Sequence, residues 1–369
     1  MKSGSELVLP TGGAASGRGV GKSAQGRSVA VALASAGVFT NLSASSAIAS
    51  HAKSRTLPRA AAWVVASLGA FEWVALGYLA LSSVMITIFA RNLAHPGKLL
   101  LADAIVAVII LVLSSAGLAA EARIQRDGLT PGRRMVRFWR HWYPHLFFLF
   151  CFEELAFLVH LVNPNWQDAK LIAFDHWLFG VHPSVWLEQF VTPLRNDFFQ
   201  LAYLTYFVYL LVLGGILYVR RDWHAYWSVM TYSAVGYAIG YVIAALFPIQ
   251  SPWFAMAGMW QQPELHGGPF TATINFIEHY GRVRGAAFPS EHVAGSVAAL
   301  WGAWRHRRWL FWVMLPLVAA MCVSTIWGRY HYVADIFGGI ITGSLGYFIG
   351  ALIMRSGKAV AAPGDVAAR

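Results

Sequence analysis

Long apolar stretches recur along the chain and alternate with short polar or basic segments. A helix needs about 20 apolar residues to cross the hydrocarbon core of a bilayer. Eight stretches approach or reach this length, and together they predict an all-α fold: a polytopic membrane bundle of about eight transmembrane helices. They lie at 64–90, 99–119, 144–162, 198–219, 226–248, 292–304 extended by its flanks, 309–327 and 331–354.

The two ends of the chain differ in composition from these stretches. Residues 1–60 are rich in Gly, Ala and Ser, and Glu6 is their only acidic residue. Such a composition favours a flexible basic tail. The alternative is a targeting segment, with the apolar run at 29–39 followed by a small-residue cleavage site at 47–49. Residues 355–369 are predicted to be a C-terminal tail.

Charge is scarce and biased towards one side of the predicted bundle. Only 12% of the residues are charged, against about 25% in soluble domains, which argues against a soluble globular protein. The net charge is +11. If the N-terminus is cytoplasmic, 21 of the 28 Lys and Arg residues fall on the cytoplasmic side. The positive-inside rule then predicts that both termini are cytoplasmic. Because topology explains the basic excess, we expect membrane lipids and no nucleic acid as partners.

Residues 121–143 are unusually basic and also aromatic. Phe138, Trp139 and Trp142 are interleaved with the arginines there. The pattern fits an interfacial segment facing anionic lipid, and an ordinary basic loop fits it equally well. The arginines are Arg123, Arg126, Arg133, Arg134, Arg137 and Arg140.

Two segments on the opposite side are long, at about 163–197 and 249–290. Loops of this length without repeats are often functional. The second leads into Phe288-Pro289-Ser290-Glu291-His292. Ser290 is a suitable N-cap for a helix, and the free amides of the first turn predict an anion site within reach of His292.

A second candidate motif opens the last span. His331 and Asp335 are four residues apart, so on a helix they share a face and the carboxylate can orient the imidazole. The predicted topology places His292, His331 and Asp335 on one membrane face with Arg282, Arg284 and Arg329. An ionisable cluster at that depth predicts a functional site.

These motifs resemble those of a known family. Pro289-Ser290-Glu291-His292 and His331-x3-Asp335 resemble motifs two and three of the type 2 phosphatidic acid phosphatase superfamily, and more closely its branch containing inositol phosphorylceramide synthases. Asp175-x-x-Leu178-Phe179-Gly180 with Pro183 is also similar to that branch. The resemblance covers 144–354, as a six-helix phosphatase or phosphotransferase core. The two additional transmembrane helices of 61–120 lie outside it.

The resemblance implies a mechanism for the cluster. His331 attacks phosphorus to give a phosphohistidine, Asp335 orients His331, and His292 protonates the leaving oxygen and later activates the acceptor. Ser290 and neighbouring amides hold phosphate oxygens. The implied protein is an integral membrane enzyme acting on a lipid phosphate at the extracytoplasmic or lumenal face. Its intermediate is resolved by water or by an alcohol or lipid acceptor, and the mechanism requires no cofactor or metal.

The chain also departs from the family pattern. The first motif, Lys-x6-Arg-Pro, is missing, Glu291 replaces the usual glycine, and Ser324-Thr325 stands where Ser-Arg is usual. A phosphoryl group that develops charge needs fixed positive groups. We expect them to come first from Arg284, then from Arg329 and Arg282.

Other functions and plainer roles for single residues remain alternatives. A headgroup transferase of the inositol phosphorylceramide synthase type uses the same residues as a phosphatase, whereas a transporter or an inactive scaffold would not need them. Glu291 is expected to be an acid favoured by the helix dipole rather than a catalytic group. Tyr203, Tyr206 and Tyr209 are expected to form a packing stripe rather than a headgroup cage. Asp103, Glu153 and Glu154 are expected to be neutral carboxyls facing the bundle. We expect solvated side chains at His160, Asp168, Asp175, His176, His182, His266 and His279.

Overall fold

The computed structural model describes residues 59–281 and 283–356. Within these residues the chain forms helices and one isolated bridge between Ile249 and Ala286, without a strand. This confirms the predicted all-α class. Nearly all of the predicted N-terminal tail, most of the predicted C-terminal tail and Arg282 lie outside the described residues.

The helices follow one another with short connections. Their order and bounds are α3 (Arg59–Ser67), α4 (Ala70–Ile88), η2 (Ala90–Asn92), α5 (Pro96–Asp127), α6 (Pro131–Leu158), α7 (Asp168–Phe179), α8 (Pro183–Leu187), η3 (Glu188–Phe190), α9 (Pro193–Leu204), α10 (Tyr206–Val219), α11 (Trp223–Leu246), α12 (Pro252–Ala255), η4 (Ala257–Met259), α13 (Pro269–Gly281), α14 (Glu291–His306), α15 (Arg308–Trp327) and α16 (Val333–Arg355).

Six helical segments of the described chain are long and apolar enough to cross a membrane. They are Ala70–Ile88, Pro96–Asp127, Pro193–Val219, Trp223–Leu246, Arg308–Trp327 and Val333–Arg355. The predicted count of eight is not confirmed, because α6 and α14 are not among them. Helix α14 has only 16 residues, and α6 begins with the arginine-rich part of the chain.

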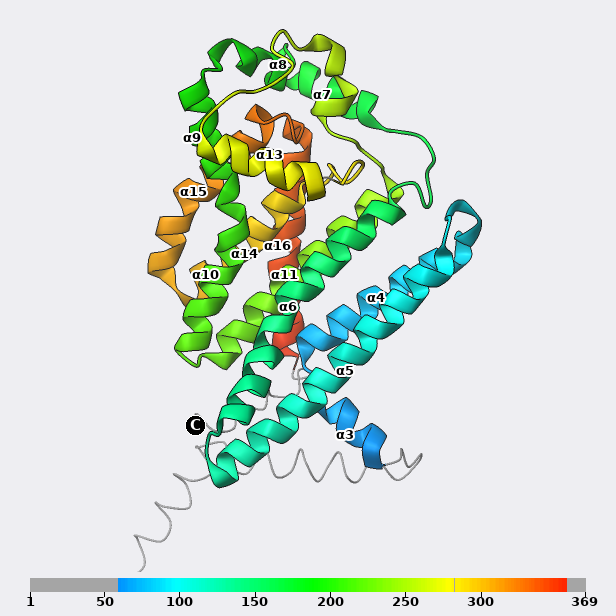
Figure 1. Cartoon of the computed structure of the whole chain (residues 1–369), viewed down its shortest axis with the longest axis vertical. Helices are drawn as coiled ribbons and strands as arrows, with labels where there is room; N and C mark the ends of the chain where they lie inside the picture. Colours follow the sequence, from blue (N-terminus) through cyan, green and yellow to red (C-terminus); the bar gives the residue numbers. More distant parts are fainter. Residues whose placement is uncertain (1–58, 282, 357–369) are drawn as a thin grey trace, which may run out of the picture. The chain divides into compact units, whose positions relative to one another are not determined.

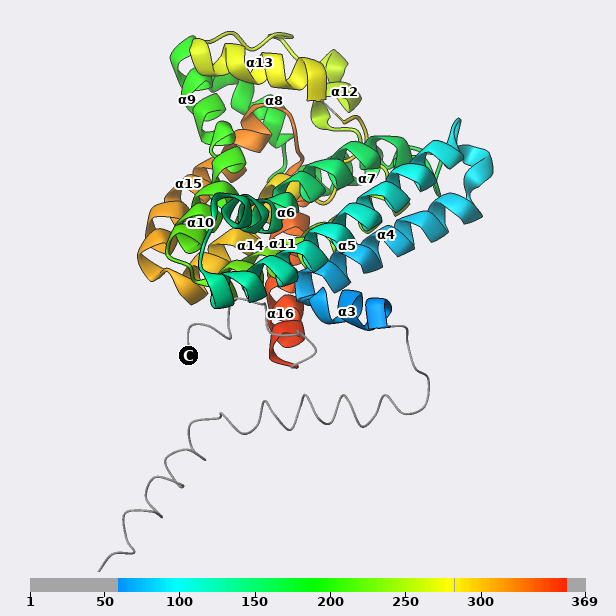
Figure 2. The same cartoon turned by 60° about the horizontal axis from the view of Figure 1, so that its bottom comes forward.

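The long helices run beside one another, and most of the short helices that follow α6 lie at one end. Figure 1 shows α7, α8 and α13 at the upper end of the bundle. Figure 2 shows α13 lying across that end, near α9 and α12. These short helices come from the two long segments that the sequence predicts on one side, so both loops are folded structure.

The basic segment 121–143 forms the end of α5 and the beginning of α6. Arg137 forms an ion pair with Glu121 at 2.8 Å between these helices. Arg140 is buried and pairs with Glu72 of α4 at 2.7 Å. The expectation that this arginine faces lipid or water is therefore wrong.

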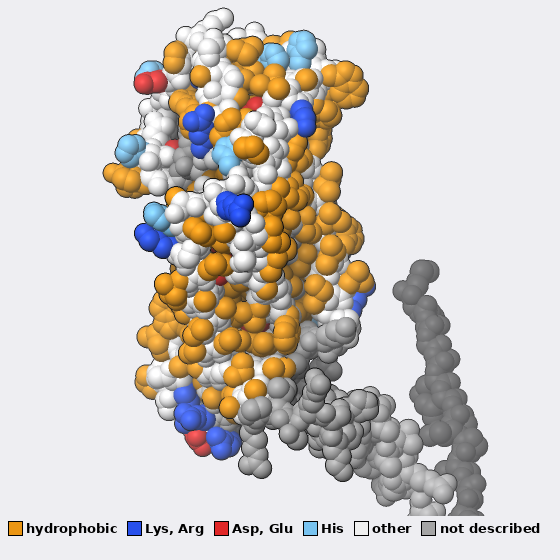
Figure 3. Space-filling view, turned by 90° about the vertical axis from the view of Figure 1, so that its right-hand side faces the viewer, with side chains coloured by type: hydrophobic (Ala, Val, Ile, Leu, Met, Phe, Trp, Pro, Cys, Tyr) orange, Lys and Arg blue, Asp and Glu red, His pale blue; other side chains and the backbone are white. Residues whose placement is uncertain are grey.

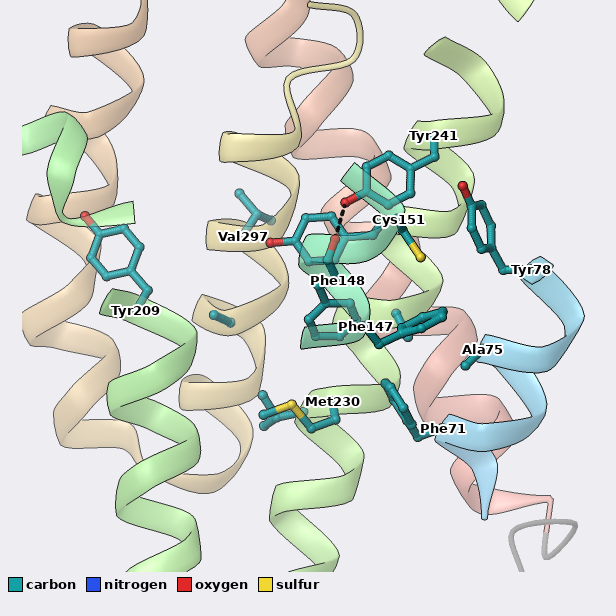
Figure 4. Packing of buried hydrophobic residues seen from close by; sticks show 14 of the residues in the cluster. Phe71, Ala75, Tyr78, Phe147, Phe148, Cys151, Tyr209, Met230, Tyr241 and Val297 are labelled. Carbon is teal, nitrogen blue, oxygen red and sulfur yellow. Dashed lines mark hydrogen bonds between the residues drawn. The ribbon is translucent and has the colours of Figure 1, made fainter. Parts of the chain in front are cut away.

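A buried hydrophobic cluster joins eight helices, namely α4, α5, α6, α10, α11, α14, α15 and α16. Figure 4 shows Phe71, Phe148, Tyr209, Met230 and Val297, which come from α4, α6, α10, α11 and α14. Phe71 packs edge-on against Phe148 with the ring centroids 5.9 Å apart, a favourable geometry for two aromatic rings. The two added helices α4 and α5 thus share a core with the rest of the bundle, α5 through Ile110.

Small residues let the helices that carry the predicted site approach closely. A Cβ atom at Gly339 of α16 would lie 2.5 Å from the carbonyl oxygen of Ser290, and one at Gly343 would overlap with the carbonyl of Ala294. This is the small-xxx-small contact of membrane helices. It brings the first turns of α14 and α16 together.

The surface has an apolar middle and polar ends. Figure 3 shows hydrophobic side chains over most of the middle of one face, with Lys and Arg near its two ends and His near the upper end. Inside the bundle, Asp103 and Glu154 are buried and accept hydrogen bonds from Ser83 at 2.8 Å and from Ser82 at 3.0 Å. An apolar belt with paired polar groups inside is what a bilayer requires.

Candidate active site

The segment before α14 is held in place by backbone hydrogen bonds. The amide of Ala287 donates to the carbonyl of Ile249 at 3.0 Å, and the amide of Ser290 donates to the carbonyl of Asp335 at 3.0 Å. Ser290 is fully buried and caps α14, accepting the amide of Val293 at 3.4 Å. The end of one loop is thus fixed against the first turn of α16.

His331 and Asp335 meet as their spacing predicts. Nδ1 of His331 lies 3.2 Å from Oδ2 of Asp335 and 2.9 Å from the carbonyl oxygen of Ala287. Both neighbours accept hydrogen bonds only, so Nδ1 must carry the proton. Nε2 of a neutral His331 then keeps its lone pair, which makes it the nucleophilic nitrogen of the ring.

His292 is the second histidine of the cluster and lies beside the first. Its Nδ1 is 3.2 Å from Nε2 of His331, although the residues are 39 positions apart. Because Nε2 of His331 is an acceptor, Nδ1 of His292 donates to it, and Nε2 of His292 becomes an acceptor in turn. The hydroxyl of Tyr203 lies 2.7 Å from that atom and donates to it.

Tyr203, Tyr206 and Tyr209 have a second role beyond packing. All three line a cavity of about 430 Å³ that also reaches His292 and His331. The prediction of a packing stripe is therefore incomplete, since the same residues form part of a cavity wall. Their three-residue spacing indicates a shared face but does not show which histidine Tyr203 meets.

Two carboxylates of α7 hold the start of α16. Asp175 accepts the amides of Val333 at 2.8 Å and Ala334 at 3.1 Å. Asp168 accepts the hydroxyl of Tyr332 at 2.9 Å. Burial raises the pKa of both carboxyls, and the hydrogen bonds they accept oppose this. The expectation that these two residues are solvated is wrong, because each is buried in the contact between α7 and α16.

Arg329 precedes His331 by two residues, but its guanidinium is engaged elsewhere. Its guanidinium is 1% exposed and forms an ion pair with Glu188 at 3.1 Å. It also stacks on Trp260, with its central carbon 4.1 Å from the ring centroid. Burial lowers the pKa of Arg329, and the carboxylate of Glu188 opposes that shift. This arginine is not among the residues that line the cavity.

Arg284 lies nearer to the cavity and is exposed. Its guanidinium donates to Oε1 of Gln250 at 3.0 and 2.6 Å, and Gln250 lines the cavity. Arg282 lies outside the described residues, between Gly281 and Val283, which both line the cavity. Among the described side chains, no group of three or more His, Cys, Asp or Glu is arranged to hold a metal ion.

Part of the chain matches the sequence model of a known superfamily. The sequence model of the PAP2 superfamily matches residues 169–349, which include His292, His331 and Asp335 and leave α4, α5 and α6 outside. No curated protein and no solved structure matches the chain. Members of this superfamily are phosphatases and phosphotransferases, so the match supports a phosphoryl-transfer enzyme.

Proposed function

We propose that this protein is an integral membrane enzyme that removes or transfers the phosphoryl group of a lipid phosphate through a phosphohistidine at His331. The observation that carries the proposal is the chain of hydrogen bonds from Asp335 through His331 to His292 at the wall of a cavity. Each bond in this chain fixes the tautomer of the next ring. A nucleophile with a free lone pair and a proton donor therefore stand side by side.

The first step uses both histidines. Nε2 of His331 attacks phosphorus, the N–P bond forms, and the bond from phosphorus to the lipid oxygen breaks. The substrate phosphate must first replace the hydrogen bond between the two rings, which leaves the Nδ1 proton of His292 facing the ligand. His292 gives this proton to the departing alkoxide, so charge does not build up on the leaving oxygen.

The second step decides between two products. Water or an alcohol attacks the phosphohistidine, its proton passes to His292, and the N–P bond breaks to restore the lone pair of His331. Attack by water makes the protein a phosphatase, and we favour this outcome slightly over transfer. An alcohol gives a phosphotransferase, including a headgroup transferase of the inositol phosphorylceramide synthase type. The cavity of about 430 Å³ supports room for an acceptor beside the phosphate.

Positive charge for the phosphate is assigned to the start of α14 and to arginines nearby. Ser290 and the first amides of α14 form one side, where the helix dipole favours an anion. Arg284 reaches the cavity wall through Gln250. Arg282 and Arg329 remain the other two candidates, and the ion pair of Arg329 with Glu188 makes Arg284 the better one.

The proposed orientation places both termini in the cytoplasm and the site on the extracytoplasmic or lumenal face. It can be tested in a background with Cys151→Ser and Cys322→Ser. Trp177→Cys on α7, where the native side chain is 76% exposed, should react with a membrane-impermeant maleimide added outside. Arg126→Cys at the other end should react only after permeabilisation. The reverse pattern contradicts the orientation.

The activity is tested by single-turnover incubation of the purified protein with a radiolabelled lipid phosphate. We expect an acid-labile protein-bound phosphate in the wild type and none in His331→Ala. His292→Ala should turn over far more slowly than the wild type. Unchanged turnover in both variants rules out the mechanism. Adding choline, inositol or ceramide as acceptors separates transfer from hydrolysis, because only transfer gives a phosphate ester of the added acceptor.

A further inference from the structure

Glu291 is buried at the beginning of α14, immediately before His292. Glu291 is 3% exposed, and its side chain points at α11, where Gly240 leaves room for the carboxyl. A Cβ atom at position 240 would overlap with Oε1 of Glu291. The carboxyl therefore lies between α14 and α11. An acid that only interacts with the helix dipole would not need this space.

The carboxyl of Glu291 lacks a partner within the described part of the chain. Neither Oε1 nor Oε2 accepts or donates a hydrogen bond there. A buried polar group left in this state destabilises the fold, and more so when it is charged. Glu291 also lines the 430 Å³ cavity. A ligand in the cavity is the group that would satisfy it.

The wall of the cavity is aromatic and acidic. Tyr206, Tyr237 and Tyr241 line it beside Glu291, and Glu153 and Glu278 line it further along. Among the described lining residues there is no Lys or Arg. A cavity made for phosphate alone would be lined by cations, whereas aromatic faces with a carboxylate are the usual surroundings of an ammonium group.

We propose that Glu291 and the surrounding tyrosines bind the ammonium group, either a primary amine or a quaternary ammonium, of a zwitterionic lipid headgroup whose phosphate lies at His292 and His331. This inference rests on the proposed function, and it names the class of substrate. Glu291 and His292 both line the cavity, so one ligand there can contact both side chains. The positive group of the substrate then supplies a charge that the described lining residues of the cavity do not supply.

The same arrangement selects against other donors. An ammonium group gives the buried carboxyl of Glu291 the partner that keeps it ionised, whereas a headgroup that carries only negative charge gives it none. Phosphatidylethanolamine and phosphatidylcholine are therefore the expected donors. Phosphatidate and phosphatidylinositol are the donors that Glu291 disfavours.

Binding can be measured without turnover. Thermal unfolding of the purified full-length protein is followed with phosphocholine, phosphoethanolamine or inositol 1-phosphate. A ligand that binds only the folded state raises the melting temperature in a concentration-dependent way. We expect the two zwitterions to do so in the wild type and in His331→Ala, but not in Glu291→Gln. Glu291→Asp, which keeps the charge, should recover part of the shift. Equal shifts in wild type and Glu291→Gln, or with inositol 1-phosphate, overturn the inference.

Turnover gives a second test, expressed as a ratio of donors. For Glu291→Gln, we expect kcat/KM for phosphatidylethanolamine relative to phosphatidate to fall about ten- to a hundredfold. An unchanged ratio means that Glu291 does not recognise the headgroup and contradicts the inference. If the wild type turns over neither donor, the proposed function fails, and the melting experiment still decides whether the cavity binds an ammonium group.

Discussion

Asp335 and the carbonyl of Ala287 together determine which nitrogen of His331 carries the proton. Its Oδ2 lies 3.2 Å from Nδ1 of His331 and also accepts the amide of Tyr332 at 2.8 Å. The carboxylate is therefore fixed in position, and the ring beside it is limited to one tautomer. That choice passes through His292 to the hydroxyl of Tyr203, so one carboxylate orders three side chains on three helices or loops.

Replacing Asp335 by Asn tests this control of the tautomer. Asn is neutral and its amide group can donate towards Nδ1, so only the carbonyl of Ala287 would still hold the proton there, and the tautomer with a lone pair on Nε2 of His331 would be less favoured. We expect kcat to fall about 10²- to 10⁴-fold, in the range found for groups that act in proton transfer. Steady-state kinetics and the yield of protein-bound phosphate should fall together. A kcat within threefold of the wild type would show that Asp335 does not set the tautomer.

Tyr203→Phe removes the donor to Nε2 of His292. His292 can then adopt the other tautomer, which turns the lone pair of Nδ1 towards that of His331 and separates the two rings. We expect kcat to fall about tenfold, the worth of one hydrogen bond to a partly charged group, with little change in KM.

Tyr209→Phe is the matched control for this substitution. Tyr209 lines the same cavity, but its hydroxyl bonds to Thr205 rather than to a histidine. Its kcat should stay within about twofold of the wild type, since the change removes one neutral hydrogen bond away from the reacting groups. Similar losses in the two variants would mean that both act through packing of the cavity wall.

Arg329 is expected to stabilise the fold more than it assists catalysis. Arg329→Ala leaves the buried carboxylate of Glu188 without its partner, and breaking such a pair costs about 3–5 kcal/mol. Arg284→Ala removes an exposed side chain and should change the unfolding free energy by less than about 1 kcal/mol. Denaturant unfolding in detergent measures both. Unchanged stability of Arg329→Ala together with a large loss in kcat/KM would instead make this arginine a phosphate ligand.

Much of the fold follows from the sequence because each membrane helix must satisfy its own backbone. The apolar stretches at 309–327 and 331–354 coincide with α15 and α16 to within two residues. Helix α14 is harder to classify, since its apolar run is short and its burial depends on the helices around it.

In the site, too, contacts within one helix can be predicted from the sequence, whereas contacts between helices cannot. His331 and Asp335 are predicted because their spacing of four is a property of one helix. Tyr203 meets His292 across 89 positions, and Asp175 meets Val333 across 158. Spacing along a chain reports only neighbours on the same element. Contacts between elements depend on the packing of whole helices, so these partners and the buried carboxyl of Glu291 appear only in three dimensions.

The fit between Glu291 and Gly240 gives a final prediction that does not depend on any activity. Gly240→Ala places a methyl group where the carboxyl of Glu291 lies, and overpacking of this kind costs about 1–3 kcal/mol. Adding Glu291→Gly removes the clash, so the double variant should regain most of that loss.

Gly215→Ala in α10 is the control, because a Cβ there meets its nearest neighbour at 3.9 Å, and a helical Ala in place of Gly should stabilise by about 0.5–1 kcal/mol. The unfolding free energies of the wild type, Gly240→Ala, Glu291→Gly and the double variant form a double-mutant cycle. Residues in contact should give a coupling of at least about 0.5 kcal/mol in this cycle. Additive effects would mean that the carboxyl of Glu291 does not occupy the space beside Gly240, and the ammonium site would then lose its geometric basis.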